Sequence, residues 1–219
     1  MTSLTSVERE ILDGMLERRP DLSDCVDPLL ALHRALVVMY DGGGKLLTCG
    51  NGGSNADAMH IVGELCKSFE RKRSITSGFA EALQKYPHGE ELAEHLEMGL
   101  ASIALGFNGS LKTAVENDSS LRDIAFAQEA MALVKPGDLL LAISTSGNAD
   151  NCLMAMSVTK AIGGLAVSLT GPMGGDMADF ADIAIKAPGD STKTIQEAHI
   201  VLYHTMCAMI EAHYYPEKR

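Results

Sequence analysis

Short apolar runs recur along the chain and predict strands. Four of them occupy residues 45–49, 139–144, 164–169 and 182–187, and a weaker fifth covers residues 101–106. Most of the sequence between these runs has the apolar spacing of amphipathic helices. Because strands that alternate with helices form a parallel sheet covered on both faces, the pattern predicts an α/β fold with a doubly wound parallel sheet.

Helical patterns also occupy the N-terminal part of the chain. Thr5 followed by Glu8 matches a capping box and predicts a short helix. Asp27 and Pro28 predict the N-cap and the first residue of a second helix, which ends where a run of three glycines begins. We expect the two helices to form an extension over about residues 1–42.

Two further segments complete the pattern. Residues 194–213 carry apolar side chains at helical spacing and predict a long final helix. Residues 70–99 are polar, rich in glutamate and interrupted by a Pro-His-Gly turn, so they predict an insertion or lid built from short helices. Because the sequence contains no repeat array and no linker, residues 1–219 are expected to form one domain.

Charge and composition argue against several classes of partner and site. The 219 residues carry a formal net charge of -11 with no long basic run, which disfavours nucleic acid and membrane surfaces as partners. No apolar stretch approaches the roughly 20 residues of a membrane helix, and the N-terminus lacks a signal-peptide core, so a cytoplasmic location is expected. The five cysteines form no CxxC pair, so neither a disulfide framework nor a thiolate zinc site is expected.

The segment after the first predicted strand is the most informative one chemically. It forms a glycine turn, Asn51, Gly52 and Gly53, and a helical pattern follows that Ser54 or Asn55 is able to cap. Backbone N–H groups and the positive end of the helix dipole both point to such a turn. The turn is therefore a candidate site for a phosphate.

His60 and Glu64 lie one turn apart on the same face of this predicted helix. A histidine supplies a metal ligand and a glutamate supplies a general base, so the pair is a candidate acid/base and metal site. Taken one at a time, each is more commonly a structural or a solvated residue. Their neighbours are apolar, however, and a charged residue in a packed helix requires a partner.

A second turn, Ser144, Thr145, Ser146 and Gly147, follows the apolar run at 139–144. Two such turns after two parallel strands meet at the carboxyl edge of the sheet, where ligands of open α/β folds bind. The hydroxyl groups of this turn are candidates for holding a phosphate. Neither turn is a Walker A motif or a complete GxGxxG fingerprint, which disfavours nucleotide binding.

The predicted final helix supplies further polar candidates, which are Gln196, Glu197, His199, His204 and His213. Eight residues, slightly more than two turns, separate Gln196 from His204, so their faces broadly overlap. His199 follows Gln196 by three residues and competes with His204 as a ligand. The spacing does not choose between the two histidines.

Three motifs together resemble the SIS-domain phosphosugar isomerases, and among them the phosphoheptose (sedoheptulose 7-phosphate) isomerases. The motifs are CGNGGSNADAMHIVGEL, AISTSGNADN and IQEAHIVLYH, in this order. The resemblance implies a flavodoxin-like fold and a homotetramer whose active sites are shared between subunits. It also implies an isomerase that converts sedoheptulose 7-phosphate to D-glycero-D-manno-heptose 7-phosphate with one zinc ion per subunit.

The resemblance further implies roles for the residues at the matching motif positions. Glu64 and His204 match the acid/base pair, so the resemblance selects His204 over His199. The metal-binding positions are matched by His60, Glu64, Gln196 and His204. The substrate-binding positions, of which the Ser-Thr-Ser turn would hold the phosphate, are matched by Asn51, Gly52, Gly53, Ser54, Asn117, Asp118, Ser144, Thr145, Ser146 and Gln196.

A ketose–aldose interconversion requires these residue types. A proton moves between adjacent carbons through an enediol, which needs a base for the carbon and an acid for the oxygens. A zinc ion would polarise the carbonyl and stabilise the enediolate. Because a carboxylate that coordinates zinc is a weaker base, we interpret Glu64 as the base and its metal contact as secondary.

The chain departs from the family pattern at positions that bear on the substrate. Residues 67–70 are Lys-Ser-Phe-Glu, where the family has Gly-Arg-Tyr-Arg. Ala149 occupies a position where the family usually has a serine, and Lys193 occupies one where it usually has an acidic residue. Two alternatives therefore stay open. One is an isomerase of another phosphoketose, and the other is a non-catalytic SIS module that binds a phosphosugar or a partner protein. The retained metal and acid/base positions favour the enzyme.

Overall fold

The centre of the protein is a five-stranded sheet in the computed structural model, which describes residues 4–216. Its strands are β1 (Leu46–Gly50), β2 (Ser102–Ala104), β3 (Leu139–Ser144), β4 (Leu165–Thr170) and β5 (Ile183–Lys186). Their spatial order is β2-β1-β3-β4-β5, and all neighbours are parallel. Because this is the strand order of flavodoxin-like folds, the predicted doubly wound α/β fold is confirmed.

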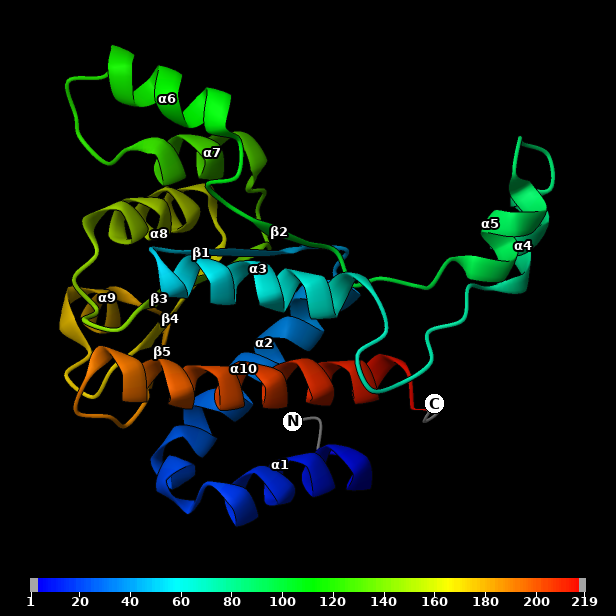
Figure 1. The fold of residues 1–219 in the computed structure, drawn as a ribbon, viewed down its shortest axis with the longest axis horizontal. Helices are drawn as coiled ribbons and strands as arrows, with labels where there is room; N and C mark the ends of the chain where they lie inside the picture. Colours follow the sequence, from blue (N-terminus) through cyan, green and yellow to red (C-terminus); the bar gives the residue numbers. More distant parts are fainter. Residues whose placement is uncertain (1–3, 217–219) are drawn as a thin grey trace.

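Helices cover both faces of this sheet (Figure 1). One core joins the sheet to α1 (Ser6–Arg18), α2 (Val26–Asp41), α3 (Gly53–Cys66) and α10 (Thr192–Tyr214). The other core joins it to α7 (Ala125–Leu133), α8 (Asp150–Ile162) and α9 (Gly175–Phe180). Leu139 and Leu141 face the first core, whereas Leu140 faces the second. Burial on both faces explains why the strands are continuous apolar runs in the sequence.

The first helix end agrees with the sequence prediction, since Thr5 caps α1 through the predicted capping box with Glu8. Ser191, which the sequence analysis did not single out, caps α10. The predicted cap at Asp27 is wrong, because α2 continues directly from a 3-10 helix (Pro20–Cys25) and begins at Val26 without a side-chain cap. Within residues 4–216, no helix is long and apolar enough to cross a membrane.

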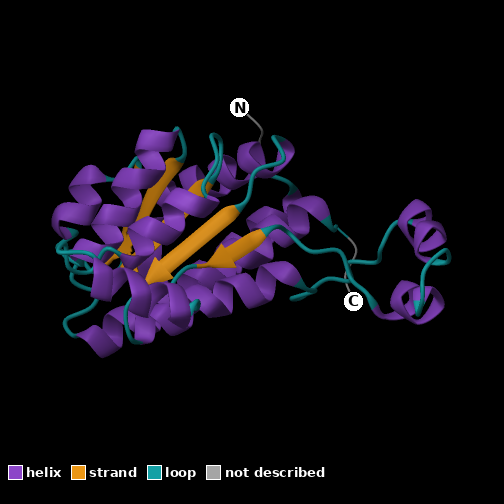
Figure 2. Ribbon diagram, turned by 90° about the horizontal axis from the view of Figure 1, so that it is seen from above, coloured by secondary structure: helices purple, strands orange, loops and turns teal. Residues whose placement is uncertain are grey.

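The predicted insertion forms an arm that projects from the body (Figures 1 and 2). The arm, residues 74–97, contains α4 (Ser77–Leu83) and α5 (Gly89–His95), which pack against each other. An antiparallel bridge between Ser74 and Glu97 closes its base. The prediction of short helices in this segment is therefore confirmed.

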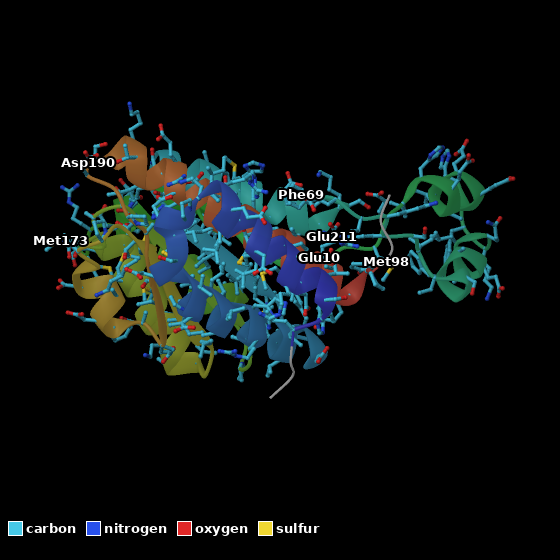
Figure 3. All side chains as sticks on the ribbon, turned by 90° about the horizontal axis from the view of Figure 1, so that it is seen from below. Glu10, Phe69, Met98, Met173, Asp190 and Glu211 are labelled. Atoms are coloured by element: carbon cyan, nitrogen blue, oxygen red, sulfur yellow. The ribbon has the colours of Figure 1, made fainter. Side chains whose placement is uncertain are left out.

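A buried ion pair fixes the chain between α3 and the arm. The carboxylate of Glu211 accepts hydrogen bonds from the backbone N–H groups of residues 69–71 and, at 2.8 Å, from Nε of Arg73. Arg73 also donates to the carbonyl oxygens of Glu64 and Leu65 at the end of α3. Both charged side chains are fully buried, and Glu211 lies at the end of the body nearest the arm (Figure 3). The pair therefore holds the end of α3 against the last turns of α10.

Candidate active site

The two glycine-containing turns lie side by side, as predicted. They follow β1 and β3, which are hydrogen-bonded neighbours with Gly50 opposite Ile143. Two reciprocal amide hydrogen bonds, of 2.9 and 2.8 Å, join the side chains of Asn51 and Asn151. The sequence motifs contained Asn151 but gave no reason to single it out. The pair ties the first turn to the beginning of α8 and fixes the two turns relative to each other.

The first turn begins α3 without a capping side chain. Gly52 is the N-cap residue, with φ 55° and ψ -117°, a conformation that favours glycine. The predicted capping by Ser54 or Asn55 is wrong, because Ser54 is buried inside the first helical turn and Asn55 donates instead to the Gly50 carbonyl. The positive end of the helix is therefore directed toward the turn, with no side chain capping it.

The beginning of α10 lies against this turn. A Cβ atom added at Gly53 would lie 2.3 Å from Nε2 of Gln196, far inside contact distance. The structure thus brings Gln196 together with the glycine turn, from the opposite end of the chain. Gln196 is half-buried there.

In the second turn, the serine hydroxyl groups already organise the backbone. Ser144 Oγ accepts from Gly147 N–H and Ser146 Oγ accepts from Asn148 N–H, each at 3.2 Å. The two serine hydroxyls lie 3.4 Å apart, and Thr145 between them is half-buried. Accepting these backbone N–H groups uses neither hydroxyl proton, so the turn can present hydroxyl donors to a phosphate once the bond between the two serines opens.

His60, Glu64 and His204 are in contact across α3 and α10. Nε2 of His60 lies 3.2 Å from Oε1 of Glu64 and 3.5 Å from Nε2 of His204. The two imidazole rings meet edge to face with centroids 4.9 Å apart. His199, by contrast, is buried against the sheet, where its Nε2 lies 3.0 Å from the Thr170 carbonyl oxygen. The structure therefore distinguishes the two histidines, which their spacing in the sequence did not: His204 lies beside His60 and His199 does not.

A tyrosine and an aspartate behind His60 fix its tautomer. Tyr203 donates its hydroxyl proton to Oδ1 of Asp57 at 3.2 Å, and the same hydroxyl lies 3.0 Å from Nδ1 of His60. Because its only proton is used, the hydroxyl accepts from Nδ1–H, which leaves the lone pair on Nε2. Sequence reasoning missed both residues, although Asp57 lies three positions before His60 and Tyr203 adjoins His204.

The electrostatics of the site favour an ionised Glu64 and a neutral His204. Burial raises the pKa of the Glu64 carboxyl, but the 2.9 Å hydrogen bond from Lys67 and the charge of Lys67 outweigh burial and hold this pKa below its usual value. Burial, reinforced by His60, lowers the pKa of His204. At neutral pH a carboxylate able to accept a proton therefore adjoins an imidazole with a free lone pair.

Two distances between donor atoms at His60 match those of a zinc site. A tetrahedral zinc ion with bonds of about 2.0–2.1 Å separates its ligand atoms by about 3.3 Å, close to the two distances found here. The tautomer of His60 presents a lone pair toward both neighbours. Gln196, the fourth expected ligand, lies instead against Gly53, and the helical rise between it and His204 is about 12 Å. The structure thus places Glu64 and His204, two of the other expected ligands, beside His60.

Asn117 and Asp118 lie apart from this cluster. They end α6 (Gly109–Asp118), where the Asn117 amide donates to Oδ1 of Asp118 at 2.9 Å and both side chains are exposed. α6 packs on α7, over the opposite face of the sheet from α10 (Figure 1). Their predicted role toward the sugar stays a prediction.

Comparison with known proteins identifies both the domain and its relatives. Residues 118–214 match the family model of the SIS domain. The phosphoheptose isomerase of Thiobacillus denitrificans is 37% identical over 196 residues, which cover 88% of this chain and 87% of the relative. That of Aneurinibacillus thermoaerophilus is 38% identical over 175 residues, which cover 80% and 76%.

Solved structures agree with these relatives. A phosphoheptose isomerase from Neisseria gonorrhoeae superposes with a TM-score of 0.69 at 30% identity, covering 91% of this chain and 94% of that one. One from Francisella tularensis gives 0.71 at 27% identity, covering 96% and 98%. Shared motifs, fold and extent of identity lead to one assignment. The chain is an isomerase and belongs to the phosphoheptose isomerase family of SIS-domain proteins.

Proposed function

We propose that the protein interconverts sedoheptulose 7-phosphate and D-glycero-D-manno-heptose 7-phosphate. The observation that carries this proposal is the position of His60, whose Nε2 lies within 3.5 Å of both Glu64 Oε1 and His204 Nε2. A protein that only bound a phosphosugar would need neither an ionised base nor a histidine with a fixed tautomer beside it. The names of the curated relatives support a heptose phosphate as the substrate.

In the proposed reaction, Glu64 takes a proton from the carbon next to the ketose carbonyl, and the freed electron pair forms the double bond of an enediol. Through His204, the hydroxyl proton of that carbon passes to the former carbonyl oxygen. Glu64 then returns its proton to the second carbon, which yields the aldose and restores both residues. The Ser144 to Ser146 turn would hold the phosphate while Asn51 and Gly53 face the sugar.

We further propose one zinc ion per subunit at His60, with Glu64 and His204 beside it; Gln196, the remaining ligand that the motifs imply, would have to turn away from Gly53 to take part. When bound, zinc would act as a Lewis acid for the sugar carbonyl. The Asp57 and Tyr203 interactions support this assignment, because metal-binding histidines typically donate their second N–H to such a partner.

Incubation of the purified protein with sedoheptulose 7-phosphate tests the proposed function. With and without added zinc, we expect aldose formation and uptake of solvent deuterium at the carbon next to the carbonyl. Binding of the sugar phosphate without either signal would contradict the enzyme assignment. Turnover of a different ketose phosphate in a parallel reaction, without turnover of the heptulose, would reassign the substrate while keeping the chemistry.

Replacing Lys67 by methionine is expected to move the acidic limb of the kcat/KM profile to higher pH. The reaction needs Glu64 ionised, so the rate falls as pH drops through the Glu64 pKa. Lys67 lowers that pKa by its hydrogen bond and its charge, and its removal therefore raises it. Lys72→Met, at an exposed position of the same segment, is the matched control. An unshifted limb would exclude Glu64 as the group titrated.

Replacing Gly53 by alanine is expected to lower turnover by up to about 10²-fold with little loss of stability. The new methyl group would displace the end of the flexible Gln196 side chain, which moves at low cost in folding free energy. Gly63→Ala on the same helix is the matched control, because a Cβ atom there meets nothing within 4 Å. Steady-state kinetics and thermal unfolding of both variants measure the effect. Equal activities would show that the position of Gln196 does not matter.

We also propose that the arm contacts a neighbouring subunit within a homotetramer. Four of its large apolar side chains are exposed: Phe79, Tyr86, Leu92 and Leu96. Helices of seven residues without a core of their own have little stability in water. In Figure 3 the arm's side chains extend into open space beyond the body. We therefore propose that a second copy of the chain covers the apolar side chains of the arm.

Substituting serine for both Phe79 and Leu92 is expected to lower the molecular mass measured by light scattering during gel filtration. The change removes apolar area that the neighbouring subunit would cover. Met173→Ser is the control, because Met173 is 86% exposed and lies at the opposite end of the molecule (Figure 3). An unchanged mass for the arm variant would remove the arm from the interface.

A further inference from the structure

Three ionisable side chains from three helices meet beneath the N-terminal helix. Glu8 lies on α1, His33 on α2 and His213 on α10. Oε1 of Glu8 is 2.9 Å from Nδ1 of His213 and 3.3 Å from Nε2 of His33. One ligand atom from each residue lies within 4.8 Å of the other two. Nine residues of α10, about 13 Å of helical rise, separate this cluster from His204.

His33 presents an unpartnered nitrogen to the centre of the cluster. The residue is 4% exposed, and its buried Nε2 has no hydrogen-bond partner. The Met209 backbone forms a hydrogen bond with the same ring, which must therefore involve Nδ1. The proton accordingly lies on Nδ1, and a lone pair on Nε2 faces the Glu8 carboxylate. A backbone partner on the outer nitrogen is the usual arrangement for a histidine that binds a metal.

Glu8 contributes a buried negative charge to the same point. It is 1% exposed, and its Oε2 accepts the Thr5 N–H at 2.7 Å, so Oε1 is the oxygen that faces the imidazoles. Burial raises the pKa of the Glu8 carboxyl, but its hydrogen bonds with the Thr5 backbone and His213 outweigh burial and lower this pKa overall. Burial lowers the pKa of His33 as well. At neutral pH the cluster thus combines an ionised carboxylate with a neutral imidazole, a charge distribution that a cation would complete.

We propose that Glu8, His33 and His213 bind a divalent transition-metal ion of the zinc class, with water as the fourth ligand. Two imidazole nitrogens and one carboxylate oxygen form a donor set suited to zinc, cobalt or nickel and unsuited to magnesium or calcium. The His213 side chain is 25% exposed, which gives the ion and the water a route of entry. The exposed Arg34 side chain acts electrostatically on His33, so its positive charge would also repel an ion bound there.

The ion has a structural role in this proposal. In Figure 1, α1 lies along the outside of α10, and no strand holds it in the sheet. A metal bound by one residue from each of α1, α2 and α10 would fasten the N-terminal helix to the body. Ligand binding to the folded chain alone raises its stability by mass action.

Cobalt titration of the metal-free His60→Ala/His204→Ala variant tests this proposal independently of the isomerase site. We expect one Co²⁺ per chain, with a visible absorption band, and a higher unfolding temperature when Zn²⁺ is added. A further His213→Gln substitution, at a partly exposed position, should abolish both signals. His88→Gln, at an exposed histidine of the arm, should change neither.

Failure of the double variant to bind Co²⁺ would overturn the proposal and leave a metal-free hydrogen-bonded cluster. The same conclusion would follow if binding persisted undiminished in the His213→Gln variant. His33→Gln provides a second ligand variant, and a circular dichroism spectrum establishes that each tested chain is folded. Because the starting variant already lacks two residues of the proposed isomerase site, loss of isomerisation does not enter either readout.

Discussion

Replacing Glu64 by glutamine is expected to lower kcat by about 10²–10⁴-fold while the affinity for the sugar phosphate stays largely unchanged. Glutamine keeps the size and polarity of the side chain but cannot take up a proton. The phosphate and sugar contacts proposed for the two turns do not involve this carboxylate. Rapid-quench turnover and equilibrium binding of sedoheptulose 7-phosphate separate the two effects.

Glu197→Gln is the matched control for this substitution. Glu197 lies on α10 close to the site in sequence, but its side chain is exposed. We expect its variant to turn over at the native rate. If Glu64→Gln also kept native turnover and native deuterium exchange, another group would have to be the base.

Replacing Arg73 by methionine is expected to destabilise the protein by about 3–5 kcal/mol, because it leaves the buried carboxylate of Glu211 without its charged partner. For a chain of this size the loss corresponds to a fall of roughly 10 °C in Tm. Turnover should fall as well, since Arg73 also holds the Glu64 carbonyl at the end of α3. Thermal and urea unfolding measure the first effect and kinetics below the transition the second.

Arg19→Met removes an ion pair of similar length, 2.7 Å to Asp21, from an exposed position. Exposed pairs contribute about 0–1 kcal/mol, so this control should change Tm by no more than a few degrees. A loss of equal size in both variants would show that burial of the Arg73 and Glu211 charges adds nothing. A loss below about 1 kcal/mol for Arg73→Met would mean that water reaches Glu211.

The strands and the turns could be predicted because each depends on local sequence. The run at 139–144 coincides with β3, and the other four runs agree with their strands within two residues. Parallel pairing then placed the turns after β1 and β3 at one edge without further information. Helix periodicity likewise predicted that His60 and Glu64 share a face.

The contacts that complete the site depend on which helices pack together, and periodicity carries no such information. Tyr203 meets His60, Asn151 meets Asn51, and Glu211 meets Arg73 across more than 99 residues in each case. Each partner alone is an ordinary polar residue in a helix or turn. The resemblance to a family selected His204, whereas the buried position of His199 became evident only when α10 was placed against the sheet.

The parallel packing of α3 and α10 sets a fixed length scale for the substrate. The two helices meet at Gly53 and Gln196 and again at His60 and His204, two turns further along both. Helical rise places these levels about 10–12 Å apart, and neither a loop nor a side-chain rotation can shorten that interval. If the phosphate is anchored beside the first level and the proton is transferred at the second, the spacing of the two levels sets the length of the carbon chain that can reach both. Sugar phosphates that are too short would bind at one level without reaching the other. The site would therefore discriminate between substrates by chain length before it discriminates between their stereoisomers.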